Sequence, residues 1–179
     1  MDLHTEYGLI KVVNDPNYSF NSTDNARRYA LEIRLTADSI SSIHGVYLNG
    51  DGIAVIGAGG GCSAVHEHSA LEIDDKLYLA VGDSVVCLSL ESPRRLLWSV
   101  QTDMATCFGI HWAEQQRALI SHGELEISRL STEGVIAWQT SGADIFSEGF
   151  RLLSDYVETI DFNGAVYRID YVTGEFLGS

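Results

Sequence analysis

The sequence has 179 residues, of which 45% are hydrophobic, and this is enough for one domain with a substantial core. Its 25 acidic and 11 basic side chains give a formal net charge of −14. Such a surface repels nucleic acids and anionic membranes, which bind proteins through basic side chains. We therefore expect neither as a partner, whereas a basic protein would be attracted.

Three features predict a cytoplasmic protein with free thiols. The start of the chain, MDLHTEYGLIKVVND, lacks the basic and apolar regions of a signal peptide. No apolar run approaches the ~20 residues that a membrane-spanning helix needs. The three cysteines cannot all pair within one chain, which is typical of a reducing compartment.

Residues 1–68 predict strands and loops without a clear repeat. Residues 14–28 are polar and rich in turn formers, so we expect a long loop, with a short helix near Thr23 as an alternative. Alternate residues of YALEIRL, 29–35, are apolar, which predicts a half-buried strand. The segment GVYLNGDGIAVIG, 45–57, predicts two strands joined by a tight Asn-Gly turn.

A glycine cluster, residues 57–61, follows the second of these strands. It partly fits a dinucleotide-binding fingerprint, but Cys62 stands where the third glycine should be. The rest of the chain also lacks the alternation of strands and helices that such a fold requires. We therefore interpret the cluster as a corner at which the chain turns and two backbones pass closely.

Downstream of residue 68 the sequence repeats with a period of about 40 residues. Three segments can be laid over one another, and each predicts a strand, a tight turn, a strand, a turn and a third strand: 77–100, 117–140 and 155–178. The intervening segments 105–115 and 144–153 each predict one strand more. Four strands in about 40 residues are typical of a propeller blade.

These segments resemble the blade motif of quinoprotein-type (PQQ-like) β-propellers over residues 69–179. In that family a strand ends in a small polar turn, often Thr-Gly, and a tryptophan follows a few residues later. Here Gly134 and Gly174 match the turn, and Trp98 and Trp138 match the aromatic residue. The third unit departs from the pattern, with Gly178 at the tryptophan position. The resemblance carries over no cofactor-binding residue.

We therefore expect a single all-β domain, residues 1–179, built as an antiparallel β-meander with about three blade-like repeats and a divergent N-terminal part. Propellers have ~4 to 8 blades, so three repeats do not close a ring. Residues 1–68 could form a divergent fourth blade. Otherwise the sheets stay open, or a homo-oligomer completes them through its open sheet edges.

Cys62, His66 and His68 are the candidate metal ligands. If residues 62–68 are extended, these side chains share one face, because side chains alternate along a strand. Thiolate and imidazole suit zinc, and a fourth ligand could come from His44, His111 or Asp51. We favour the alternative in which the histidines line an exposed strand and Cys62 is a buried apolar residue. No other cofactor is predicted.

No catalytic constellation stands out, and we favour a protein that is not an enzyme. The nucleophile elbow GxSxG is absent, and the sequence does not show whether Cys107 and His111, or Ser63 and His66, pair in space. Trp112 interrupts the repeat pattern beside His111. An exposed tryptophan is a good anchor for a partner, so these two residues are the candidate partner-binding residues.

Three functions follow from these features. The leading one is a non-enzymatic binding or interaction module with an acidic surface, which in one form neutralises a basic protein partner. The second is a zinc-binding protein or metalloenzyme that uses Cys62, His66 and His68. The third is a structural β protein that assembles with copies of itself.

Overall fold

The computed structural model describes residues 1–177, in which all regular secondary structure is β-strand. Sheet A has the order β1-β2-β4-β5-β3, and its strands are β1 Asp2–Thr5, β2 Gly8–Asn14, β3 Leu31–Arg34, β4 Ser42–Leu48 and β5 Asp51–Ala58. Sheet B contains β6 Ala70–Ile73, β7 Lys76–Val81, β8 Ser84–Ser89 and β9 Leu96–Gln101.

The remaining two sheets follow in the same way. Sheet C contains β10 Cys107–Ala113, β11 Ala118–Gly123, β12 Glu126–Leu130 and β13 Ile136–Ser141. Sheet D contains β14 Gly149–Leu152, β15 Tyr156–Ile160 and β16 Val166–Asp170. No helix occurs in residues 1–177, and so none there is long and apolar enough to cross a membrane. The long loop predicted for residues 14–28 is confirmed, since residues 15–30 form neither helix nor strand, and the alternative of a short helix near Thr23 is wrong.

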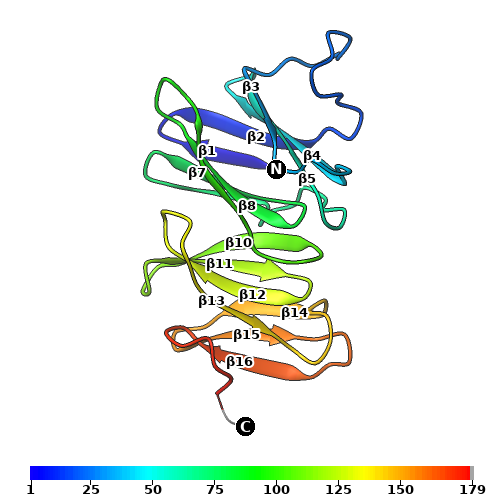
Figure 1. Cartoon of the computed structure of the whole chain (residues 1–179). Helices are drawn as coiled ribbons and strands as arrows, with labels where there is room; N and C mark the ends of the chain where they lie inside the picture. Colours follow the sequence, from blue (N-terminus) through cyan, green and yellow to red (C-terminus); the bar gives the residue numbers. More distant parts are fainter. Residues whose placement is uncertain (178–179) are drawn as a thin grey trace.

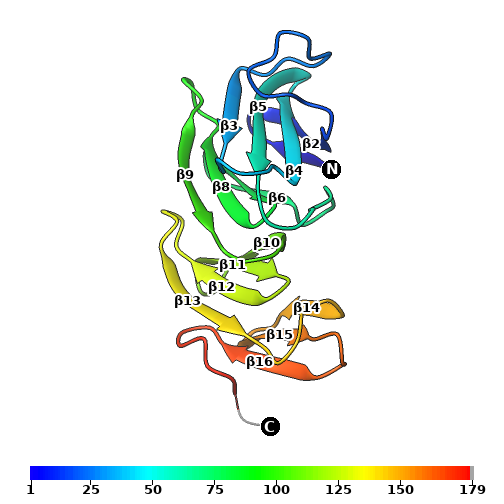
Figure 2. The same ribbon diagram turned by 45° about the vertical axis from the view of Figure 1, so that its right-hand side comes forward.

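The four sheets are stacked in chain order from the N-terminus to the C-terminus (Figure 1). Figure 2 shows β9 and β13 along one side of this stack and β6, β10 and β14 along the other. The predicted all-β architecture with blade-like repeats is confirmed, and segments 105–115 and 144–153 supply β10 and β14. In the third unit, the last strand is reduced to a single bridge between Ile169 and Phe176, and Gly178 lies outside the described residues.

Residues 1–68 contribute a sheet of their own. The predicted hairpin is confirmed, because Asn49 and Gly50 join β4 to β5 with φ angles of 54° and 94°, as a tight hairpin turn requires. The predicted strand 29–35 is β3, but β3 pairs with β5 in parallel. This one pairing departs from the expected antiparallel meander, because the long loop carries the chain across the sheet before β3 begins.

Each inner sheet buries both faces, which explains the continuous apolar runs of its strands. In β7, Leu77, Leu79 and Val81 pack in the core between sheets A and B. Tyr78 and Ala80, which point the other way, pack in the core between sheets B and C. A third core lies between sheets C and D. Neighbouring sheets are therefore held together by apolar burial, the dominant favourable contribution to folding.

The long loop 15–30 covers the outer face of sheet A. The hydroxyl of Tyr29 lies over Gly45, where an added Cβ would collide with it. An added Cβ at Gly57 would lie 2.7 Å from the ring of Phe20. Glycine at these two positions therefore allows the aromatic side chains to lie directly on the sheet, and the loop shields this face from water.

Tryptophans fix sheets B and C each to a turn of the following sheet. The Trp98 Nε1–H donates to the Thr132 carbonyl at 3.0 Å, and an added Cβ at Gly134 would lie 2.6 Å from the indole ring. Trp138 repeats this arrangement: its Nε1–H donates to the Tyr171 carbonyl at 2.9 Å, and Gly174 lies equally close to its ring. Trp98 and Trp138 are 40 residues apart, as are Gly134 and Gly174, because they form two equivalent contacts between sheets.

This contact can be tested with two glycines whose φ angles are both 81°, Gly134 and Gly164. Alanine at either position is strained by the backbone angle, but only at Gly134 does the new Cβ also meet an indole ring, since nothing lies within 4 Å of it at Gly164. We expect Gly134→Ala to lower the free energy of unfolding by about 1–3 kcal/mol more than Gly164→Ala, measured by urea denaturation. Equal losses would contradict the proposed close contact with Trp98.

Candidate functional site

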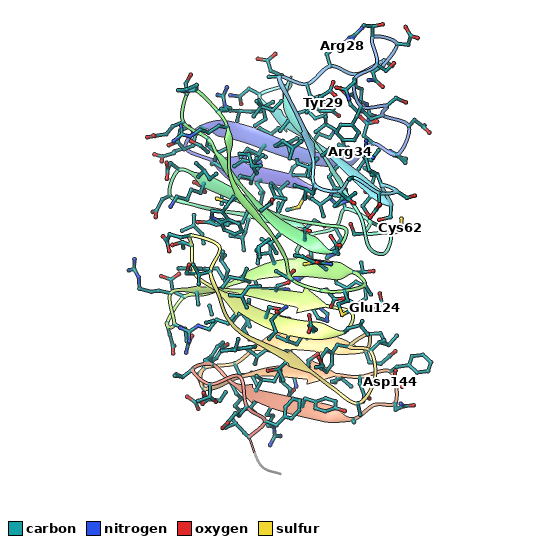
Figure 3. The ribbon with its side chains drawn as sticks, viewed as in Figure 1. Arg28, Tyr29, Arg34, Cys62, Glu124 and Asp144 are labelled. Atoms are coloured by element: carbon teal, nitrogen blue, oxygen red, sulfur yellow. The ribbon has the colours of Figure 1, made fainter. Side chains whose placement is uncertain are left out.

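Alternate connections of the meander lie at the same edge of the stack, because each antiparallel strand reverses the chain. We call one of these edges the acidic edge, and it consists of six connections: residues 59–69, 82–83, 102–106, 124–125, 142–148 and 161–165. Figure 3 shows Cys62, Glu124 and Asp144 along this side of the molecule. The other connections of sheets B, C and D form the opposite edge.

Backbone hydrogen bonds join neighbouring connections along the whole acidic edge. In each case an N–H of one connection donates to a carbonyl of another connection nearby: Asp83 to Gly59 at 3.2 Å, Gly61 to Ala105 at 2.6 Å, Glu124 to Thr106 at 2.7 Å, Phe146 to Glu124 at 2.7 Å and Phe162 to Ile145 at 2.8 Å. Side chains on this edge are therefore mounted on a fixed backbone, and binding there would require little ordering of the loops.

The glycine cluster forms the first of these contacts. β5 ends at Ala58, and Gly60 has a φ of 75°, which favours glycine. An added Cβ at Gly60 would collide with the Ala105 carbonyl, and one at Gly61 with the hydroxyl of Thr106. The interpretation of the cluster as a corner where two backbones pass closely is confirmed.

The two edges of the stack differ in the charges that they carry. Its six connections hold seven carboxylates and no lysine or arginine, and the carboxylates are Glu67, Asp83, Asp103, Glu124, Asp144, Glu148 and Asp161. The opposite edge mixes both signs, because Arg94, Arg95 and Arg117 lie in its connections. A cation approaching these six connections therefore meets no lysine or arginine within them.

Two of these carboxylates are buried and build the turns. Asp103 is buried and accepts N–H groups of Ala105, Leu125 and Glu126. Burial raises the pKa of Asp103, although these donors partly offset it. Asp161 is also buried and accepts the N–H groups at 163 and 165. The remaining five are exposed or half-buried.

Apolar side chains stand among these charges. Met104, Leu125 and Phe162 lie in three of the connections and are 79%, 37% and 63% exposed. A pocket of about 360 Å³, which we call the edge pocket, opens between the connections 102–106, 124–125 and 142–148. Exposed apolar groups in a row with charges are typical of a surface that binds another protein.

A second feature brings together four of the chain's six histidines. His66, His68, His111 and His122 line a pocket of about 420 Å³ together with Phe108 and Phe150, and we call this the histidine pocket. Ring centroids are 4.5 Å apart for His68 and His111, for His111 and Phe150, and for His122 and Phe150. The rings come from the connection 59–69, from β10 and β11 of sheet C and from β14 of sheet D.

Two of these imidazoles are neutral at pH 7. Burial, followed by the neighbouring histidines, lowers the pKa of His111 to about 3. Burial lowers the pKa of His122 to about 4, although its Nε2–H donates to the Phe146 carbonyl at 3.0 Å and partly opposes the shift. The Nε2 of His111 is buried and has no hydrogen-bond partner. His111 and His122 therefore contribute aromatic, uncharged side chains to the pocket.

The candidate zinc ligands do not form a site. Residues 62–66 are irregular and a turn follows, so the extended strand expected for 62–68 is wrong. Cys62 is exposed, which also corrects its expected burial, whereas His66 and His68 lie in the histidine pocket. Within residues 1–177, no group of three or more His, Cys, Asp or Glu side chains could hold a metal ion. Zinc binding by this set stays a prediction without a formed site.

The candidate partner-binding residues lie close together. His111 belongs to the histidine pocket, and with Trp112 it also lines an adjoining groove of about 670 Å³ along the first strands of the four sheets. Trp112 is half-buried, and its Nε1–H donates to the Glu114 carboxylate at 2.5 Å. Binding of a partner by these two residues stays a prediction.

No protein-family model matches the sequence, and no curated protein matches it. Among solved structures, the chain is similar to BamB from Moraxella catarrhalis, a PQQ-like β-propeller-fold protein, with a TM-score of 0.55 and 14% identity. The match covers 99% of this chain and 62% of the BamB chain, so this chain spans less than two thirds of that length. At this identity the likeness shows a β-propeller-like fold and nothing of the activity.

The histidine pocket predicts a loss of stability on mild acidification. As the pH falls through about 6.5, the unfolded chain takes up a proton at His111 and at His122, but the folded chain does not until the pH approaches 3 to 4. The unfolded state therefore binds more protons, and the free energy of unfolding falls by up to about 1.4 kcal/mol per pH unit for each histidine.

Urea denaturation at pH 7 and pH 5 measures this effect. The variant His111→Phe removes one of the two contributions and also removes the unpaired buried Nε2. We expect it to be more stable than the wild-type chain at pH 5, by a larger margin than at pH 7. The same margin at both pH values would show that His111 takes up protons equally in the folded and unfolded chains.

Proposed function

We propose that this chain is a non-enzymatic protein-binding module whose acidic edge binds a basic protein partner. One observation carries the proposal: seven carboxylates and no lysine or arginine occupy the six connections at one edge, whereas the opposite edge mixes charges. The simplest alternative, solubility, requires only a high net charge and does not require that all cations be absent from one edge.

The structure of this edge supports binding in two ways. The hydrogen bonds between connections fix the backbone before a partner arrives, which lowers the entropic cost of association. Met104, Leu125 and Phe162 provide apolar surface that a partner would cover, and such contacts hold a complex that charges have steered together. A partner that is neutralised by stoichiometric binding would be the strictest form of this function.

Two variants with the same net charge test the proposal. In the edge variant, Glu124→Gln, Asp144→Asn and Glu148→Gln remove three charges from the acidic edge, and Glu126→Gln removes a fourth at the start of β12, where Glu126 lines the edge pocket. In the control variant, Asp74→Asn, Glu91→Gln, Glu133→Gln and Asp155→Asn remove four exposed charges at the opposite edge. Each variant has a formal charge of −14 + 4 = −10. Proteins captured from a lysate of the source cells at low and moderate salt are then identified by mass spectrometry.

We expect the wild-type chain and the control variant to capture the same basic protein at low salt, and the edge variant to bind it about tenfold or more weakly. If the two variants lose the partner equally, net charge rather than the edge is responsible, and the proposal is wrong. If only copies of the chain itself are captured, self-association through open sheet edges replaces it.

A further inference from the structure

The edge pocket is lined by apolar side chains from three successive connections. The apolar walls of the pocket are the side chains of Met104, Leu125 and Ile145. The Met104 side chain is 79% exposed. The connections keep their spacing because Glu124 N–H donates to the Thr106 carbonyl and Phe146 N–H donates to the Glu124 carbonyl. The pocket is thus a fixed, solvated apolar recess, which gains stability when apolar groups cover it.

Two carboxylates also line this recess. Glu126 is half-buried, and one of its oxygens accepts from the side-chain amide of Gln139 at 3.0 Å. Asp144 is exposed, and it accepts the Ile145 N–H at 2.8 Å and the Asn163 side-chain amide at 2.7 Å. Both carboxylates are therefore held in place. Burial and the nearby Asp103 raise the pKa of Glu126, so a cation beside it would relieve an unfavourable charge.

This combination of walls and charges limits what the pocket can hold. A purely apolar side chain would cover the walls but would desolvate Glu126 and Asp144 without compensation. A small inorganic cation would contact the carboxylates but leave Met104 and Leu125 exposed to water. Lysine and arginine carry a methylene stem that packs on apolar surface and a charged group that reaches a carboxylate.

We propose that the edge pocket binds a lysine or arginine side chain of the basic partner. The methylene stem lies against Met104, Leu125 and Ile145, and the charged group lies between Glu126 and Asp144. This proposal rests on the proposed function and makes it specific, because it names the side chain by which the partner is anchored at the acidic edge.

Three short synthetic peptides measure separately how the methylene stem and the charged group of lysine contribute to binding. All have flanking residues of 2,4-diaminobutyric acid, which carries an ammonium group on a stem two methylenes shorter than that of lysine. The central residue is lysine, norleucine or 2,4-diaminobutyric acid, which provides stem and charge, stem alone, or charge alone. Binding to the full chain is measured by isothermal titration calorimetry at low salt.

We expect the lysine-centred peptide to bind at least about fivefold more tightly than either of the others, because only lysine uses both the walls and the carboxylates. The double variant Met104→Ser, Leu125→Ser should bind the lysine and diaminobutyric acid peptides equally. The matched control Val135→Ser, at a 64% exposed position on the opposite edge, should keep the preference for lysine.

The outcomes distinguish this proposal from the proposed function. If the lysine and diaminobutyric acid peptides bind the wild-type chain equally, the pocket does not recognise the stem and this inference is overturned, whereas the acidic edge still binds cations. If none of the peptides binds but the edge variant still loses a captured basic protein, the pocket inference is overturned and the proposed function stands. If, in addition, the edge variant captures the same proteins as the wild-type chain, both are overturned.

Discussion

The stack depends on the close contact between a tryptophan of one sheet and a glycine turn of the next. Trp98 on Gly134 and Trp138 on Gly174 set the distance between sheets at one edge, because any side chain at either glycine would separate the two surfaces. At the other edge, hydrogen bonds from connection to connection have the same effect. Sheets B, C and D are thus fixed at both edges, and the apolar cores between them can pack closely.

Stacking leaves one face of sheet A and one face of sheet D without a neighbouring sheet. A loop covers the first of these faces, whereas charged side chains occupy the second. The outer face of sheet A is covered by aromatic side chains of the loop 15–30, which is long because it must cross the sheet. Sheet D has charges on its outer face: Glu158 lies between Arg151 and Arg168, and Arg168 also lies over the Tyr156 ring at 5.5 Å. Cross-strand neighbours of opposite charge stabilise this face while it remains in water.

The fold could be predicted from the sequence because its determinants are local and repeated. Trp98, Trp138 and the glycines that contact them recur at a fixed spacing, and each turn has its own residue signature. The acidic edge could also have been found, by separating alternate turns and counting the charges in each set. The histidine pocket could not, since His68, His111, His122 and Phe150 meet only through stacking of the sheets. The helix near Thr23 failed because local side chains such as Asn25 satisfy the backbone of that loop instead.

Because the sheets are stacked regularly, the charges of separate turns add up to one charged surface, the acidic edge. Each repeat brings its connections to the same edge, so one or two carboxylates in each connection become a row of charges along the molecule. Like charges in a row repel one another and lower stability. Asp103 and Asp161 compensate for this by accepting backbone N–H groups that hold the turns, but Glu67, which is exposed, has no such role in the described structure. The basic partner that we propose would neutralise such exposed carboxylates and remove this repulsion.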